Sequence, residues 1–311
     1  WCFRLEKSEM YKGVLLSEDM IGEQLDTGFE FIKDRSYWND EQTILPHKLS
    51  VLGKVMEVTE RKTEINKLSK FFTQNLRGTE EQAESGTCFV QGVIGSGKTI
   101  SSLLVANDIK EIFTRRGRNI ETIYINCGRK TTAYHFLCEL LYALGYPKLY
   151  GGSVGIGKLQ NLLVENLSSK NQDIFIIVDE YDKLGEDISD LLLFLLKHLP
   201  TKTRSRLSYI FITNKVRFFE EIDPRVANLV YTRTEVDFQG YNAEQVENIL
   251  RKRVNLSVDK GRIDNIDGVI RKIAAFTARS SGNIRYAIGL FKALEEVAVE
   301  KKTRASLALL D

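Results

Sequence analysis

The sequence predicts an α/β protein with a parallel sheet, helices on both faces of that sheet, and a small all-helical domain after it. Apolar runs of strand length alternate along the chain with longer segments of helical periodicity, as in βαβ units. The run at 174–178 is apolar at every position, which is typical of a strand buried on both faces of a parallel sheet. After Gly240 only helical patterns follow. We therefore expect an N-terminal extension over 1–55, a sheet domain over 56–239 and a helical domain over 240–311.

The elements follow from local patterns taken in order. Residues 1–55 carry scattered aromatic side chains without a clean period, so we expect an extension that wraps onto the domain behind it, with a turn at 44–47 where it arrives. The predicted strands lie at 87–91, 120–126, 174–178, 209–213 and 236–238. The predicted helices lie at about 59–76, 100–113, 132–144, 158–167 and 188–199, and in the helical domain at about 242–253, 265–278 and 283–300.

Composition excludes several classes of protein. The chain has 311 residues, of which 43% are hydrophobic and 28% charged, values typical of soluble globular domains. The net charge of +2 does not by itself indicate a nucleic-acid binder. No apolar run reaches the length of a membrane span and no secretory signal opens the chain, so we expect no membrane partner. The four cysteines lack metal-ligand spacing, which favours reduced thiols in an intracellular protein.

A phosphate-binding loop stands between the strand at 87–91 and the helix after it. It reads Gly92, Val93, Ile94, Gly95, Ser96, Gly97, Lys98, Thr99 and fits G-x-x-x-x-G-K-[ST], with Ile100 next in the helix. Glycines let several backbone N–H groups surround one phosphate, and the helix N-terminus adds partial positive charge. We expect Lys98 to reach the β- and γ-phosphates and Thr99 to be a magnesium ligand. The alternative, a Gly-Ser loop that only starts a helix, fits these flanks poorly.

Further polar residues follow predicted strands. Asp179 and Glu180 end the apolar run at 174–178, and the carboxyl ends of parallel strands line the ligand crevice. We expect Asp179 to hold magnesium and Glu180 to orient and deprotonate the attacking water. Asn214 follows another strand and could hold the γ-phosphate or the water, although asparagine is also common in turns. Arg285 lies one turn inside the last helix, where a phosphate contact and an ordinary surface arginine are equally compatible with the pattern.

Together these motifs resemble the AAA+ ATPases, and within them the origin-recognition initiators of archaea and eukaryotes. The segments that carry the resemblance are 92–99 (Walker A), 174–180 (Walker B), 212–214 (sensor 1), 282–287 (sensor 2), 222–226 (the initiators' Asp-Pro-Arg-Val stretch), 240–245 (the entry to their lid) and 124–127 (their second strand). The resemblance covers about 57–299. It implies a nucleotide-binding base over 56–239 and a lid over 240–311, with Arg285 contacting the γ-phosphate.

The resemblance also implies cofactors, partners and a role. The cofactors would be ATP or ADP with Mg²⁺, and hydrolysis would be slow, with ATP acting as a conformational switch. The partners would be duplex DNA and other initiator subunits or a replicative helicase, in the archaeal cytoplasm or the eukaryotic nucleus. Two alternatives stay open. One is a regulatory AAA+ ATPase of the signalling or transposition type, whose nucleotide state gates protein partners. The other is a module that holds nucleotide without turnover.

Three features depart from the family pattern. The initiators carry a C-terminal winged-helix domain, and the sequence ends at Asp311 without room for one, so we expect either truncation or DNA binding through the ATPase domain or a partner. The arginine that relatives offer to a neighbouring subunit is not clear, and Arg225 and Arg233 are weak candidates. The N-terminal 55 residues are longer than the resemblance explains. Apart from these departures, basic clusters at 115–118 and 202–206 are ordinary surface charge or salt-sensitive DNA contacts.

Overall fold

The computed structural model describes residues 2–4, 59–76, 86–128, 132–147, 149, 154–169, 172–185, 188–215, 218, 223–229 and 234–310. The chain divides into two compact units. The first takes in Trp1–Leu5 and Arg61–Phe238, and the second takes in Glu6–Glu60 and Gln239–Asp311. The predicted turn at 44–47 and nearly all of the predicted extension lie outside the described residues.

The first unit is built on a six-stranded sheet with the order β1-β3-β4-β5-β2-β6. Its strands are β1 (Cys2–Arg4), β2 (Thr87–Gly92), β3 (Ile120–Asn126), β4 (Asp173–Asp179), β5 (Arg206–Thr213) and β6 (Thr234–Phe238). The last five pair in parallel, which confirms the predicted parallel sheet. β1 pairs antiparallel with β3 and was not predicted, because three residues are too few to show a strand period.

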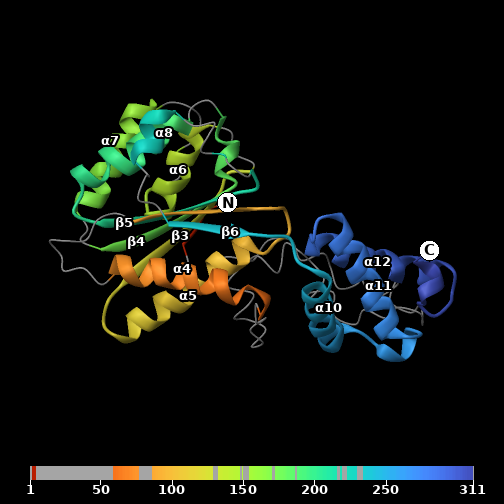
Figure 1. The fold of residues 1–311 in the computed structure, drawn as a ribbon. Coiled ribbons are helices and arrows are strands. Elements are labelled where there is room, and N and C mark those ends of the chain that lie inside the picture. Colours follow the sequence, from red (N-terminus) through yellow and green to blue (C-terminus); the bar gives the residue numbers. More distant parts are fainter. Residues whose placement is uncertain are drawn as a thin grey trace, which may run out of the picture. The chain divides into compact units, whose positions relative to one another are not determined.

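Helices cover both faces of the sheet, as predicted. Helices α6 (Ala133–Ala143), α7 (Ile156–Ser168) and α8 (Ile188–Leu193) lie on one face, and α4 (Lys62–Leu76) and α5 (Lys98–Arg115) on the other (Figure 1). The helix predicted over 188–199 consists of α8 and a π-helical turn, Phe194–His198. The short helix α9 (Pro224–Leu229) was not predicted. Every residue of β4 is buried, which explains why the run at 174–178 carries no polar position.

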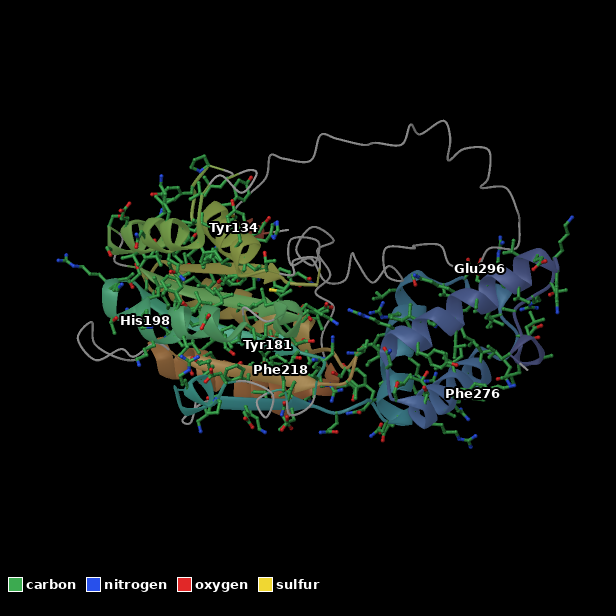
Figure 2. The ribbon with its side chains drawn as sticks, turned by 90° about the horizontal axis from the view of Figure 1, so that it is seen from above. Tyr134, Tyr181, His198, Phe218, Phe276 and Glu296 are labelled. Carbon is green, nitrogen blue, oxygen red and sulfur yellow. The ribbon has the colours of Figure 1, made fainter. Side chains whose placement is uncertain are left out.

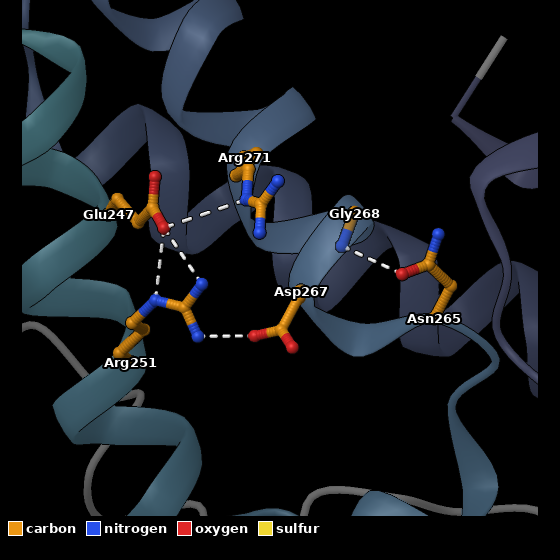
Figure 3. Close-up of polar contacts among 6 residues, drawn as sticks. All are labelled: Glu247, Arg251, Asn265, Asp267, Gly268 and Arg271. Carbon is orange, nitrogen blue, oxygen red and sulfur yellow. Dashed lines mark hydrogen bonds and ion pairs between the residues drawn. The ribbon is translucent and has the colours of Figure 1, made fainter.

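In the second unit the described residues after Gly240 form helices, as the sequence pattern predicts. This unit contains α10 (Ala243–Ser257), α11 (Ile266–Ser280) and α12 (Ile284–Glu300) around a core of its own. Asn242 and Gln245 form a capping box at the start of α10, so the turn before the helix is fixed by side chains. Arg251 on α10 pairs with Glu247 of the same helix and with Asp267 of α11, and Arg271 of α11 also approaches Glu247 (Figure 3). Among the described residues, no helix is long and apolar enough to cross a membrane.

Candidate active site

The carboxyl ends of the parallel strands bring most of the predicted site residues to one edge of the sheet. In the strand register Asp179 lies opposite Asn126 on one side and Ile212 on the other, and Gln91 lies opposite Thr213. The loop between β2 and α5 starts from this edge. The spacing of the motifs along the sequence therefore translates into proximity in space, as the parallel topology requires.

The loop adopts a conformation that its glycines permit. Gly92 has φ of 145°, and a Cβ atom there would lie 2.0 Å from the carbonyl oxygen of Phe238. Only glycine therefore fits between the loop and the end of β6. Gly97 has φ of 91° and is the N-cap of α5, so the first free N–H groups of the helix open onto the loop. The loop is thus an anion site made of backbone.

Lys98 and Thr99 are the first residues of α5, and their side chains contact different parts of the site. Lys98 is 5% exposed, and its Nζ donates to the carbonyl oxygens of Gly92 and Val93 at 2.9 and 2.8 Å. The ammonium group is therefore held across the mouth of the loop. The Thr99 hydroxyl donates to Oδ2 of Asp179 at 2.7 Å. These contacts direct the Lys98 side chain toward the loop and the Thr99 side chain toward the end of β4. Their contacts with phosphate and magnesium stay predictions.

Asp179 is a buried carboxylate with neutral hydrogen-bond donors around it. The Tyr124 hydroxyl donates to Oδ2 at 3.0 Å, and the backbone N–H of Glu180 donates to Oδ1 at 2.9 Å. Burial raises the pKa of Asp179, while the bonds from Thr99, Tyr124 and Glu180 and the charge of Lys98 oppose that rise. A hydroxyl and a carboxylate next to a phosphate loop are the hard oxygen donors that Mg²⁺ prefers, so the residues present fit this ion.

Glu180 is presented by an unusual backbone. Its φ of 53° is left-handed, which is costly for a residue with a Cβ atom. The residue after it, Tyr181, is fully buried, and its ring packs edge-on against Phe218 at 5.1 Å between centroids (Figure 2). This anchor holds the turn that carries Glu180. A Cβ atom at Gly128 would lie 2.5 Å from Oε2 of Glu180, so the carboxylate turns toward the end of β3.

Two residues of β3, Tyr124 and Asn126, contribute to the site, although no site role was predicted for them. Tyr124 bonds Asp179, and Nδ2 of Asn126 donates to the Tyr124 hydroxyl at 3.3 Å. They are two residues apart on one strand, so they share a face. The two-residue period of a strand therefore indicates that both side chains lie on the same face as each other, near the end of the neighbouring strand. This indication was overlooked because a tyrosine in a strand usually packs in the hydrophobic core.

Asn214 lies in the first unit near the other site residues, whereas Arg285 lies in the second unit. Asn214 directly follows β5 at the site edge and is half-buried. The residue before it, Thr213, donates to Oδ1 of Asp182 at 2.7 Å, which ties the end of β5 to the turn after Glu180. Arg285 is an exposed residue in the first turn of α12, where Asn283 caps the helix. It lies in the second unit, and its predicted contact with phosphate stays a prediction.

Comparison with known protein families adds a match for each unit. Residues 81–218 match a family described as an AAA domain, and residues 247–305 match the Cdc6 AAA+ ATPase-type lid domain. The chain thus carries an AAA domain followed by a lid domain of the Cdc6 AAA+ ATPase type.

Curated relatives and solved structures agree with this family. The chain is 28% identical over 251 residues to an ORC1-type DNA replication protein 1 of Archaeoglobus fulgidus, covering 79% of this chain and 58% of the relative. It is 31% identical over 217 residues to an ORC1-type DNA replication protein of Methanosphaera stadtmanae, covering 69% and 54%. The chain thus spans between half and three fifths of the length of these relatives.

The fold matches solved structures over nearly the whole chain. The structure of the Aeropyrum pernix ORC1 protein in complex with DNA gives a TM-score of 0.74 at 24% identity, over 90% of this chain and 68% of that one. The A. pernix ORC2 protein, solved as ADPNP-ADP complexes, gives 0.70 at 20% identity, over 90% and 71%. These likenesses confirm the AAA+ fold with its helical lid domain.

Proposed function

We propose that this AAA+ chain binds ATP with Mg²⁺ at the edge of its sheet and hydrolyses it slowly. The observation that carries the proposal is the 2.7 Å hydrogen bond from Thr99 to Asp179, placed directly beside the glycine loop. It joins the end of the phosphate loop to the end of a neighbouring strand, which is where a metal ion between loop and carboxylate would be bound.

Each residue of the site has a part in this proposal. The loop amides of 92–100 and the ammonium group of Lys98 would hold the phosphates. Thr99 and Asp179 would hold Mg²⁺, which when bound neutralises charge on the phosphates. Glu180 would orient the attacking water and accept its proton, and Asn214 would fix the water or the γ-phosphate. Arg285 would contact the γ-phosphate from the lid, so that the third phosphate favours one arrangement of base and lid.

The test of turnover uses two substitutions. We expect Glu180→Gln to keep ATP affinity and to lower the ATPase rate at least about 100-fold, because a general base contributes this much. We expect Lys98→Ala to lose nucleotide affinity itself. Binding is measured by fluorescence titration and turnover by phosphate release. If the wild type and Glu180→Gln both release phosphate only at the background rate, the chain is a module that binds nucleotide without turnover.

We also propose that the chain acts on duplex DNA in replication origin recognition or helicase loading. The support is the match to the Cdc6-type lid and to relatives described as ORC1-type DNA replication proteins. Its partners would be other initiator subunits or a replicative helicase, in the cytoplasm of an archaeon or the nucleus of a eukaryote.

The DNA proposal is tested by duplex binding across a salt series with ATP present. Preference for origin duplex over random duplex at physiological salt supports the initiator function. Only weak binding that salt erases would assign DNA recognition to other parts of the assembly, because non-specific binding is mainly electrostatic. The regulatory alternative would gain support if the nucleotide changed binding to protein partners without affecting DNA.

A further inference from the structure

A buried arginine lies next to the phosphate loop. Arg61 ends the 3-10 turn Thr59–Arg61 in front of α4, and it is only 3% exposed. A buried guanidinium group is costly unless its charge and its N–H donors are satisfied. The position is therefore specific, and the contacts of Arg61 indicate what it does.

The guanidinium group of Arg61 connects three parts of the first unit. Its Nε donates to the backbone carbonyl of Ser96 inside the loop at 2.9 Å. Its Nη1 donates to Oε1 of Glu64 on α4 at 3.0 Å. Its Cζ lies 5.5 Å from the centroid of the Phe238 ring, within cation–π range. The planar fork of arginine makes these contacts together, which the single ammonium group of lysine cannot reproduce.

The contact with Ser96 determines the direction of one loop amide. In a planar trans peptide the carbonyl and the following N–H point to opposite sides. When the Ser96 carbonyl is held toward Arg61, the N–H of Gly97 must point away from it. Gly97 directly precedes Lys98, so this N–H belongs to the set of loop amides that faces an anion.

The contact with Phe238 adds a second constraint on the loop. Phe238 is the last residue of β6 and of the first unit, and it lies opposite Gly92 in the sheet register. The loop is thus held at its first glycine by the backbone of Phe238 and at Ser96 by Arg61, which packs on the Phe238 ring. Arg61 and Phe238 are also the residues at which the main run of the first unit begins and ends.

We propose that Arg61 is a positioning residue that holds the Ser96–Gly97 peptide in the orientation required for phosphate binding. The proposal rests on the nucleotide binding proposed above and adds a residue outside the Walker motifs to it. Arg61 acts through the loop backbone and does not itself touch the phosphate. Glu64 in turn fixes Arg61, with the two side chains 4% and 16% exposed.

The experiment compares Arg61→Met with Arg118→Met. Both remove a guanidinium group of low exposure from the first unit, but Arg118 bonds Asp173, the first residue of β4, at the amino end of the strand. For Arg61→Met we expect about a tenfold rise in the dissociation constant for ADP, the effect of one charged hydrogen bond. For Arg118→Met we expect a lower melting temperature and an ADP affinity within twofold of the wild type.

A second measurement uses the protein without nucleotide. Hydrogen exchange of the loop amides at 92–99 should be at least about fivefold faster in Arg61→Met than in Arg118→Met, because the Ser96–Gly97 peptide is released. This readout separates the two proposals. If wild-type protein binds no ADP, the proposed function fails, while loop exchange still decides whether Arg61 orders the loop.

Two results would overturn the proposal. One is an ADP affinity in Arg61→Met equal to that of Arg118→Met, and the other is equal loop exchange in the two variants. If Arg61→Met does not fold, Glu64→Gln is the milder variant, since it keeps the Arg61 side chain and removes one charge that fixes it. An intermediate loss of ADP affinity is then expected, and wild-type affinity in Glu64→Gln would refute the positioning role.

Discussion

The two ends of strand β4 each carry a buried aspartate, and their surroundings differ. Asp173 begins the strand and is 5% exposed, while Asp179 ends it and is 6% exposed. Asp173 faces two guanidinium groups, with Nε of Arg118 2.6 Å from Oδ2 and Nε of Arg206 2.6 Å from Oδ1. Asp179 instead accepts hydrogen bonds from two hydroxyls and one backbone N–H.

This difference separates a structural ion pair from a binding site. At the amino end of β4 the charge of one carboxylate is met by two cations of the protein itself, so nothing further is required. At the carboxyl end burial raises the pKa of Asp179, and the Lys98 ammonium is engaged with loop carbonyls. A buried carboxylate with neutral donors is a group that gains from binding a cation. The same residue type on one strand thus serves stability at one end and ligand binding at the other.

The largest effect is expected from removing the negative charge of Asp179 at the carboxyl end of β4. Asp179→Asn should lower the Mg²⁺-dependent ATPase rate at least about 100-fold, because the metal loses its carboxylate. The melting temperature of the nucleotide-free protein should stay the same or rise, since a buried charge whose hydrogen-bond donors are all neutral is removed. Phosphate release and thermal unfolding measure the two effects. A large fall in stability would show that Asp179 is an ordinary part of the core.

Asp173→Asn should give the opposite pair of results. It leaves the Arg118 and Arg206 guanidinium groups without their shared charge, at a cost of about 3 kcal/mol in the free energy of unfolding. We choose the lower end of the usual range because the two arginine side chains are 27% and 21% exposed. Denaturant unfolding measures the loss. The affinity for ADP should be unchanged, and a large loss of affinity would contradict the division between the two ends.

A smaller effect is expected at Tyr124, which supports Asp179 without binding the metal. Tyr124→Phe removes the hydroxyl that lies 3.0 Å from Oδ2 of Asp179. A hydrogen bond to a charged group contributes about 1.5 kcal/mol, so the Mg²⁺ concentration for half-maximal turnover should rise about tenfold. ADP binding measured without Mg²⁺ should not change.

Tyr209→Phe provides the matched control for Tyr124→Phe. Its hydroxyl is fully buried on β5 and has no hydrogen-bond partner within the described part of the chain. Removing it should leave the Mg²⁺ dependence unaltered. Equal shifts in the two variants would mean that the tyrosines act through sheet packing and not through Asp179.

The sequence predicted the strands, the helices and the phosphate loop where a local pattern of residues has one common structural explanation. The five parallel strands follow from apolar runs, and the parallel topology brings the loop glycines, Lys98, Thr99, Asp179 and Glu180 to one edge of the sheet. The roles of these residues toward nucleotide and Mg²⁺ stay predictions. The roles of Arg61 and Tyr124 did not follow, because each depends on a partner that the fold brings close, at Ser96 and Asp179. An arginine at a helix start and a tyrosine in a strand have common local explanations. Only tertiary contacts distinguish these explanations from a role in the site.

The basic clusters illustrate the same limit of sequence reasoning. Arg118 and Arg206 come from two separate clusters of the sequence, at 115–118 and 202–206, and both are bound to Asp173. One carboxylate offsets half of their combined charge and holds both side chains in place. Arg204 belongs to the second cluster and is exposed. We expect Arg204 to contribute more than Arg206 to DNA affinity. A cation that neutralises a DNA phosphate releases counterions from the DNA, and Arg206 is already engaged with Asp173.

The smallest expected effect concerns this exposed arginine. Arg204→Gln should weaken duplex binding a few-fold and reduce the slope of log affinity against log salt by about 1, the value for one phosphate contact. Arg206→Gln should leave that slope unchanged and lower the melting temperature, since its partner is Asp173. Fluorescence anisotropy over a salt series measures the slopes. A loss of slope in Arg206→Gln with unchanged stability would mean that the amino end of β4 also binds a ligand, because the ion pair at Asp173 would then be exchangeable for phosphate.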